Sequence, residues 1–513
     1  LTLAGAGGFL AWHGLRRTEP PSPPAQSDPA PATPDTPETP PDTVATLCVS
    51  GDLVMHIPII NSCRTGDGYD FTGLFDEIRP YYESADYATA CIETTFNGPP
   101  YSGFPQFCAP DQLAGDLKTV GLDLLSTASN HSLDTWYSGL TRTLDVLDEA
   151  GLDHVGTYRT QEERDSVKVV DVGGIRLAFL AYTYGTNGLP KDEHPYCVNI
   201  FTTDYMTNCS EIDYDLLKSD LDRAKQTDAD AIAVYMHWGQ EYATSPSDQQ
   251  RELADFLFEN GATLVLGGHV HVPQPMELRE LPDGRTGFLD YCLGNLISNQ
   301  HDRYTNLTAA VNLELTKSGE TGKVTVSGAQ YVPMYMLHPD AAADGRYHLL
   351  DLNKAIAQCE SGTSTVVPSS ALPALRQGLA VIQLHAQCAV APQLVYGIRQ
   401  IGAEGGGGDE QCHAEEQAHH RGAIALAVTL EVLGGQHPGE AEELFRQAGG
   451  PDLPAPELHV LGLADGLHRR HPPRHPPGAA AGDEHGNEGE EGSPRKEGRA
   501  GAHHRGHPVE AGG

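Results

Sequence analysis

The sequence predicts an α/β fold in which helices cover a layered sheet. Between residue 44 and about residue 335, short apolar runs typical of buried strands alternate with longer segments whose leucines recur at helical spacing. Strands that alternate with helices in this way are typical of α/β proteins. Several of the runs end directly in Asp, Glu, Asn or His, which indicates a ligand site at the ends of the strands.

Five apolar runs deliver side chains that can bind a metal. They are residues 45–50 before Asp52, 85–92 before Glu93, 122–128 before Asn130 and His131, 231–236 before His237, and 264–271, which contains His269 and His271. The two glycines before His269 let the backbone turn tightly. Because ligands of open α/β sheets bind outside the carboxyl ends of the strands, we predict that these side chains share one cleft.

Helices are predicted between the strands. Leu140, Leu144 and Leu147 share one face and precede Gly151, a residue type that ends helices. A second stripe is Leu216, Leu217, Leu221 and Ala224, and a third helix runs from a start signal at Ser245 to Gly261. Residues 287–292 form a further strand candidate before Asn295, and residues 309–315 and 323–331 alternate as in a hairpin.

The charge of the chain excludes one class of function. With 33 Lys and Arg against 70 Asp and Glu, the formal net charge is -37, so non-specific nucleic-acid binding is excluded. An anionic substrate would need a positive charge in the site, from a metal or an arginine, to offset the repulsion by the chain. None of the ten cysteines forms a Cys-x-x-Cys pair, and Cys197 and Cys209 could close a loop disulfide in an exported protein.

Composition divides the chain into five regions. Residues 1–17 are weakly apolar and are interpreted as the remnant of a signal peptide or membrane anchor, and residues 18–43 as a proline-rich linker. This predicts a secreted or membrane-anchored, extracytoplasmic protein. Residues 44–340 are the predicted folded domain, and residues 341–400 an extension of uncertain order. Residues 401–513, rich in His, Gly, Pro and Glu, are predicted to be disordered.

The candidate ligands indicate a mixed oxygen and nitrogen site. Two carboxylates, one Asn and three or four histidines suit Mn, Fe or Zn better than Ca or Mg. One tetrahedral ion needs only four ligands, so this number of candidates indicates two ions. Two ions can activate water for the hydrolysis of a phosphoester or another polarised bond. Each residue also has an ordinary reading: Asp52 could cap a turn, Asn130 could cap a helix, and His237 could be a packed core histidine.

Six separated motifs carry a resemblance to a known family. They are Gly51-Asp52, Ile92-Glu93-Thr94, Ser129-Asn130-His131-Ser132-Leu133-Asp134, His237-Trp238-Gly239-Gln240-Glu241-Tyr242, Gly268-His269-Val270-His271 and Leu293-Gly294-Asn295. In order and approximate spacing the chain resembles the CapA family of capsule or poly-γ-glutamate synthesis proteins, a branch of the calcineurin-like metallophosphatase superfamily. The resemblance covers residues 44 to about 335.

This resemblance implies a four-layer αββα sandwich of the metallo-dependent phosphatase type with two divalent metal ions. It implies that Asp52 and His271 hold one ion and that Glu93 bridges both. The other ion would be held by Asn130, His237 and His269. His131 would protonate the leaving group, and Asp134 would orient it. Trp238, Glu241 and Asn295 are expected on the substrate side or in support of the ligands.

The chain departs from the superfamily pattern at three places. Phosphatases of the superfamily carry Asp-x-His at the first motif, whereas position 54 is Val and the nearest histidine is His56. Cys91 and Ser129 stand where the family usually has Asn. These changes leave the candidate ligands in place but weaken the expectation of phosphatase activity.

Three functions therefore remain open at this level. The first is a metal-dependent envelope hydrolase that acts on an anionic polymer, poly-γ-glutamate or capsule. The second is a general metallophosphoesterase with a phosphoester substrate. The third is a non-catalytic component that assembles or anchors the polymer together with synthesis or export proteins at the membrane.

Overall fold

The computed structural model describes residues 39–191, 193–387 and 399–400. All of them belong to the first of the two units into which the chain divides, Leu1–Glu443, and the second unit, Leu444–Gly513, lies outside the described residues. The predictions for residues 1–17, for most of the proline-rich linker and for residues 401–513 also lie outside them. Among the described helices, none combines the length and the apolar character that a membrane crossing requires.

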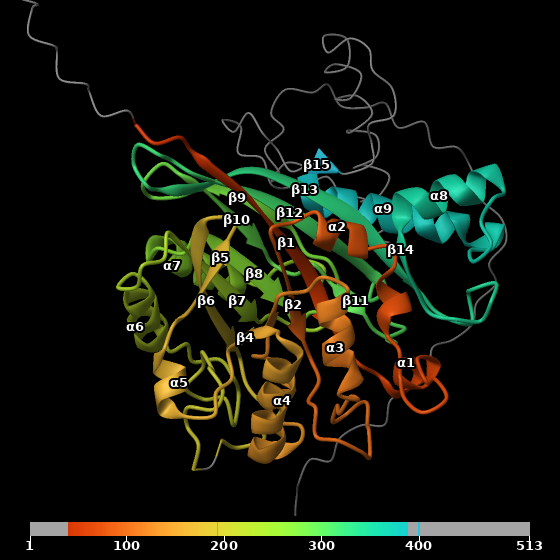
Figure 1. Cartoon of the computed structure of the whole chain (residues 1–513), viewed down its shortest axis with the longest axis horizontal. Helices are drawn as coiled ribbons and strands as arrows, with labels where there is room; N and C mark the ends of the chain where they lie inside the picture. Colours follow the sequence, from red (N-terminus) through yellow and green to blue (C-terminus); the bar gives the residue numbers. More distant parts are fainter. Residues whose placement is uncertain (1–38, 192, 388–398, 401–513) are drawn as a thin grey trace, which may run out of the picture. The chain divides into compact units, whose positions relative to one another are not determined.

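Two β-sheets form the centre of the described fold (Figure 1). The first sheet has the order β14-β13-β12-β1-β2-β3-β4, with β11 beside β1 and β15 beside β13. Its strands are β1 (Thr43–Leu53), β2 (Tyr87–Ile92), β3 (Leu124–Ser126), β4 (Asp153–Val155), β11 (Asn295–Ile297), β12 (Leu307–Lys317), β13 (Val324–Leu337), β14 (His348–Asp351) and β15 (Arg399–Gln400).

The second sheet has the order β5-β6-β7-β8-β10-β9. Its strands are β5 (Lys168–Val172), β6 (Ile175–Thr183), β7 (Ala231–His237), β8 (Leu264–Gly268), β9 (Met276–Glu280) and β10 (Thr286–Asp290). In both sheets the central strands are parallel: β1 to β4 in the first, and β6, β7, β8 and β10 in the second. The carboxyl ends of these strands therefore point to a common edge in each sheet.

Helices pack around the two sheets. They are α1 (Ile57–Ser62), α2 (Arg79–Glu83), α3 (Gln112–Thr119), α4 (Trp136–Ala150), α5 (Gln161–Asp165), α6 (Tyr214–Ala224), α7 (Asp248–Glu259), α8 (Leu352–Ser361) and α9 (Leu372–Gln387), with the short 3-10 turns Thr72–Phe75 and Ser369–Ala371. Helices α3 and α4 pack on the first sheet, and α6 and α7 pack on the second.

Three hydrophobic cores define four layers. Leu47 of β1 and Phe179 of β6 share the core between the two sheets. Leu117 of α3 lies in the core on the outer face of the first sheet, and Leu257 of α7 lies in the core on the outer face of the second. The order is therefore helix, sheet, sheet, helix, which confirms the predicted four-layer sandwich. Since each sheet is covered on both faces, its central strands are continuous apolar runs.

The predicted helix ends agree with the structure at one helix and are shifted at another. Helix α4 ends at Ala150, and Gly151 adopts the left-handed conformation with φ 75°, where glycine carries no Cβ penalty. Helix α7 starts two residues later than predicted. Its N-cap is Ser247, whose side chain accepts from the backbone N–H of Gln250 in a reciprocal capping box, and not Ser245.

The folded chain continues past residue 340. Strand β14 pairs antiparallel with β13 and extends the first sheet. Leu375 and Ile382 of α9 belong to the same apolar cluster as the core between the sheets. The predicted hairpin is confirmed, because β12 and β13 pair antiparallel from Leu307 to Lys317.

The possible disulfide between Cys197 and Cys209 is not formed, because both residues are free thiols. Cys197 is buried in a small apolar cluster with Leu133 and Leu144. The Cys209 thiol instead donates to the carbonyl of Tyr205 at 3.3 Å. The two side chains therefore lie in different local environments.

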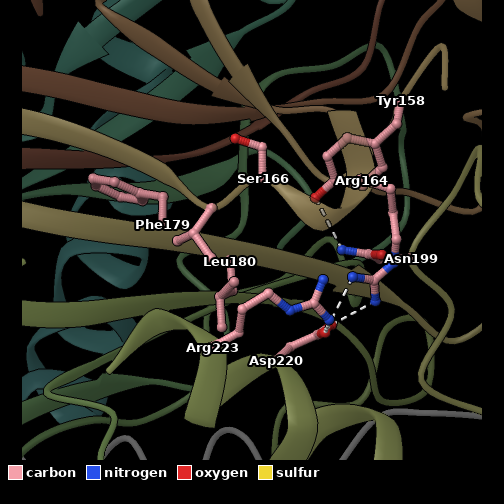
Figure 2. Close-up of a pocket in the computed structure, with 9 residues that line it drawn as sticks. Tyr158, Arg164, Ser166, Phe179, Leu180, Asn199, Asp220 and Arg223 are labelled. Atoms are coloured by element: carbon pink, nitrogen blue, oxygen red, sulfur yellow. Dashed lines mark hydrogen bonds and ion pairs between the residues drawn. The ribbon is translucent and has the colours of Figure 1, made fainter. Parts of the chain in front are cut away.

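A buried ion pair joins α5, β6 and α6 (Figure 2). The carboxylate of Asp220 is 2% exposed and accepts from Arg164 Nη2 at 2.5 Å and from the Tyr182 hydroxyl at 2.8 Å. Arg223 donates to the other carboxylate oxygen. The cavity beside this cluster measures about 10 Å³, which is room for one water molecule and no larger ligand. The cluster is therefore structural.

We expect Asp220→Asn to lower the free energy of unfolding by about 3–5 kcal/mol, because it leaves the Arg164 cation buried without its counter-charge. Urea unfolding of the variant and the wild type measures the difference. Asp222→Asn on the same helix is the matched control. Its carboxylate pairs with Lys218 and Lys225 in solvent, so that variant should unfold like the wild type. Equal effects of the two substitutions would contradict the assignment.

Candidate metal centre

The predicted ligands meet where the two sheets face each other. Asp52 lies in β1 and Glu93 directly follows β2, so the first sheet supplies both carboxylates. His237 ends β7, and His269 and His271 follow β8, so the second sheet supplies the imidazoles. All five side chains are buried. The sequence prediction that they converge is confirmed by their mutual distances.

Glu93 lies at the centre of the group. Its Oε2 is 3.6 Å from His237 Nε2, and its Oε1 is 3.9 Å from His271 Nδ1. Ligand atoms of Asp52, Glu93 and His271 all lie within 4.8 Å of one another. The rings of His237 and His269 are 4.8 Å apart between centroids. These separations are of the size that shared metal ions span.

Asn130 joins the group through two contacts. Its Oδ1 lies 2.8 Å from His237 Nε2, and its Nδ2 donates to Asn187 Oδ1 at 3.1 Å. The second contact fixes the orientation of the amide, so its oxygen faces the histidine. Asn130 can therefore offer an oxygen ligand at the same point as His237.

Unpartnered buried atoms fit a bound cation. Both carboxylate oxygens of Glu93 and the Nδ1 atom of His269 are buried without a hydrogen-bond partner in the described part of the chain. Glu93 is 0% exposed. A buried carboxylate without a partner is costly, and coordination to a divalent ion removes that cost. The donor set also has the mixed oxygen and nitrogen character of Mn, Fe or Zn sites.

The pKa values of the group follow from burial. Burial raises the pKa of Asp52 to about 7, and burial together with the Asp52 charge raises that of Glu93 well above its ordinary value. Burial lowers the pKa of His271 to about 4, and burial with the neighbouring His269 lowers that of His237. Without a cation every one of these groups is driven towards its neutral form. A nearby divalent ion would stabilise the carboxylates as anions and keep the imidazoles neutral.

The backbone of the Gly-Gly-His-Val-His turn is strained. His269 and His271 have φ of 89° and 63°, values that residues with a Cβ rarely adopt and that concentrate at functional sites. The N–H of His269 donates to Asp52 Oδ2 at 2.8 Å, which ties the turn to the first sheet. A Cβ on Gly268 would lie 2.7 Å from Asp52 Oδ1, so glycine is required for this approach.

Asn295 determines which nitrogen of His271 is free. The amide nitrogen of Asn295 donates to Gln300 and to the carbonyl of Thr305, so its oxygen faces His271 and accepts from Nδ1 at 2.9 Å. The lone pair of Nε2 is then available to a metal. Nε2 lies 3.9 Å from Glu241 Oε1, whereas Nδ1 is the nitrogen that lies 3.9 Å from Glu93 Oε1. The structure thus places Asn295 in contact with a candidate ligand, and its supporting role stays a prediction.

His131 and Asp134 form a pair beside the cluster. His131 Nδ1 donates to Asp134 Oδ2 at 2.8 Å, and the same oxygen accepts the backbone N–H of Phe107 at 2.6 Å. The Phe107 ring meets the His131 ring edge-on with centroids 4.7 Å apart. The imidazole is therefore held in one orientation, with Nε2 left for another partner.

The remaining predicted residues lie at different depths. Trp238 is wholly buried in the core on the outer face of the second sheet and donates from Nε1 to the carbonyl of Tyr291 at 2.9 Å. Glu241 is exposed, with Oε1 3.9 Å from His271 Nε2. His56, near the first motif, bonds to the carbonyl of Val54 through Nδ1 and is absent from the groups of potential ligands in the described chain.

Three residues near the ligands were not predicted as part of the site. The Cys91 thiol lies 3.9 Å from His237 Nδ1, on the opposite side of that ring from Glu93 and Asn130. Asn187 orients Asn130, and the Tyr184 ring lies 4.6 Å from the His269 ring. Tyr184 and Asn187 come from an irregular loop after β6, where no periodic pattern signals a site. Cys91 could have been predicted, because residues two apart in a strand lie on the same face and Cys91 is two residues before Glu93.

The fold and the site together define a class: a four-layer α/β sandwich with a buried cluster of carboxylates and imidazoles at the strand ends. The family can then be stated. Residues 46–300 match the family described as "Bacterial capsule synthesis protein PGA_cap", and this part of the chain belongs to that family. Every predicted site residue, from Asp52 to Asn295, lies within the matched residues. The predicted resemblance to the CapA family is thereby confirmed.

Two curated relatives carry related names. The chain is 26% identical over 286 residues to the capsule biosynthesis protein CapA of Bacillus anthracis, a match that covers 53% of this chain and 64% of that protein. It is 27% identical over 297 residues to the PGA biosynthesis protein CapA of Bacillus subtilis (strain 168), covering 56% of this chain and 71% of that protein. The match thus spans less than two thirds of the length of the Bacillus anthracis relative.

Among solved structures, a novel phosphatase from Mycoplasma pneumoniae aligns with 57% of this chain and 94% of its own, at 13% identity and a TM-score of 0.35. A similarity at this level contributes nothing to the fold assignment. That assignment rests on the two sheets and the three cores described above.

Proposed function

We propose that this protein is a metal-dependent hydrolase of an anionic capsule polymer, poly-γ-glutamate in particular, with two divalent ions between the sheets. The observation that carries the proposal is Glu93, whose two buried and unpartnered oxygens lie between His237 and His271. The polymer is proposed from the names of the relatives, which concern capsule and PGA biosynthesis. The same names support a place in the cell envelope, secreted or membrane-anchored.

The residues divide between two ions. Asp52 and His271 would hold one, Asn130, His237 and His269 would hold the other, and the two oxygens of Glu93 would serve both. When bound, the ions would activate water and polarise the bond that is cut. Mn, Fe or Zn would suit this ligand set. Asn295 and Asn187 act indirectly, since they keep His271 and Asn130 in the orientation that presents a ligand atom.

His131 is proposed to deliver the proton that the leaving group needs. Its Nδ1 is engaged by Asp134, so Nε2 is the atom that would carry and donate the proton. Asp134 keeps the ring in that tautomer, and Phe107 limits its rotation and its contact with water. In this way the pair performs the acid step without a contribution from the ligands.

A phosphoester is the second candidate substrate, because two ions held by carboxylate and imidazole ligands also suit in-line displacement at phosphorus. The valine at position 54, where phosphatases of the superfamily have a histidine ligand, speaks against it. A non-catalytic role in polymer assembly beside synthesis or export proteins is the third candidate.

Elemental analysis and two assays distinguish the candidates. The purified full chain should contain two divalent ions and should cleave poly-γ-glutamate, and His269→Ala should lose both properties. Cleavage of bis(p-nitrophenyl) phosphate alone would favour the phosphoesterase. Polymer binding without any cleavage would favour the assembly role. His348→Ala is the matched control, because that histidine pairs with Asp344 at the surface.

A further inference from the structure

A pocket is lined in part by the segment that follows His131. It measures about 620 Å³ and is lined by side chains from the start of α4, Leu133, Trp136 and Tyr137, and by Pro190, Lys191 and His194 from the loop after β6. This volume is in the range of pockets that bind small ligands or one unit of a polymer. None of the proposed metal ligands lines it.

Two chain segments join this pocket to the metal centre. In the first, His131 and Asp134 precede Trp136 by a few residues, so the proposed proton donor and the pocket wall belong to one turn. In the second, Tyr184 contacts His269 and Asn187 bonds to Asn130, and the same loop then reaches Lys191. Both walls of the pocket are therefore built from segments that also contact the metal centre.

The aromatic wall of the pocket is rigid, exposed and locally strained. Trp136 is 53% exposed and has φ 63°, a conformation that is costly for a large side chain. Tyr137 stacks on His194 with centroids 3.4 Å apart, and its hydroxyl donates to the carbonyl of Arg159 at 2.6 Å. An exposed indole beside a fixed aromatic pair presents a flat surface for aliphatic groups.

Lys191 gives the pocket a cation with spare hydrogen-bonding capacity. Its Nζ lies 3.4 Å from the carbonyl of Val198 and 5.5 Å from the centroid of the Tyr205 ring. It forms no ion pair with any residue that the structure describes. In a chain of net charge -37, such a cation is where a carboxylate gains local attraction. Glu193 also lines the pocket and would oppose an anion.

We propose that this pocket is a substrate subsite that takes one γ-glutamyl unit of the polymer, next to the unit at the metal centre. The carboxylate of that unit pairs with Lys191, and its methylene groups lie on the Trp136 ring. The assignment rests on the proposed function for the choice of polymer. It goes beyond that function because it names residues that recognise the polymer at a unit next to the one whose bond is cut.

Binding of poly-γ-glutamate to the metal-loaded full chain tests the proposal by calorimetric titration. Lys191→Gln is expected to raise the Kd by about tenfold, the usual loss for a hydrogen bond to a charged group. Trp136→Gly should also weaken binding, while glycine relieves the backbone strain at this position. Glu193→Gln should tighten binding. Lys218→Gln, an exposed lysine on α6, is the control and should bind like the wild type.

The outcomes separate this proposal from the proposed function. Weaker binding in Lys191→Gln and Trp136→Gly supports the subsite even if no hydrolysis occurs, in which case only the hydrolase assignment fails. Hydrolysis with an unchanged Kd and KM in both variants overturns the subsite alone. Absence of polymer binding, or tighter binding of polygalacturonate than of poly-γ-glutamate, also overturns it. A cooperative thermal unfolding transition in each variant shows that the variants fold.

Discussion

Glu93→Gln is expected to remove the bound metal and to lower hydrolysis by roughly three orders of magnitude, because metal ions contribute several kcal/mol to such reactions. Glu93 lies within 3.9 Å of one histidine that ends β7 and of one that follows β8. A neutral amide offers one oxygen and no charge, so it cannot serve two cations. Metal content by elemental analysis and the hydrolysis rate are the two measurements.

A thermal measurement complements this substitution. In the wild type, added Mn²⁺ or Zn²⁺ should raise the melting temperature, since ligands that bind the native state stabilise it. In Glu93→Gln that increase should vanish. The metal-free variant should melt no lower than the metal-free wild type, because burial already drives the unpartnered Glu93 carboxyl to its neutral form, which Gln resembles. Glu320→Gln, an exposed acid in the turn between β12 and β13, is the control. Two ions retained in Glu93→Gln would contradict the proposed bridge.

His131→Ala is expected to lower kcat by about 10²–10⁴-fold, the usual contribution of general acid catalysis, without loss of metal. The loss should depend on the leaving group. A substrate whose leaving group departs as a stable anion, such as p-nitrophenolate, needs no proton and should be hydrolysed by the variant at nearly the wild-type rate. Steady-state kinetics on the polymer and on such an ester give the comparison. An equal loss on both would count against the proton-donor role.

Asp134→Asn should give a smaller decrease in kcat than His131→Ala, because the histidine remains but its tautomer is no longer enforced. His154→Ala is a suitable control for the loss of a largely buried histidine, since that side chain pairs with Asp148 away from the cluster.

The layered fold and the convergence of the ligands were predictable from the sequence. The apolar runs before Asp52, Glu93 and His237 are buried on both faces of their strands, and parallel strands bring their carboxyl ends to one edge. The apolar runs predict the strands, and the ends of the strands predict where the ligands lie. The Gly-Gly pair before His269 was also a usable signal. A Cβ on Gly267 would clash with the carbonyl of Tyr291, and one on Gly268 would clash with Asp52.

Other features depend on tertiary contacts that no local pattern encodes. The sequence does not indicate which nitrogen of His271 is free, because that depends on Asn295, on a different strand. Asn187 acts on Asn130 from a loop without periodicity. The error at Cys197 and Cys209 has the same origin, since spacing along the chain does not determine the distance between two thiols.

The hydrogen bond from the His269 amide to Asp52 crosses from one sheet to the other. Ions held by Asp52 and Glu93 of the first sheet and by His237 and His269 of the second would cross-link the two sheets. Chelation should then accelerate amide hydrogen exchange in β8 and at the end of β1, whereas the long β12–β13 hairpin keeps its protection. The proposed metal centre would thereby also determine how often the two sheets open locally near the site.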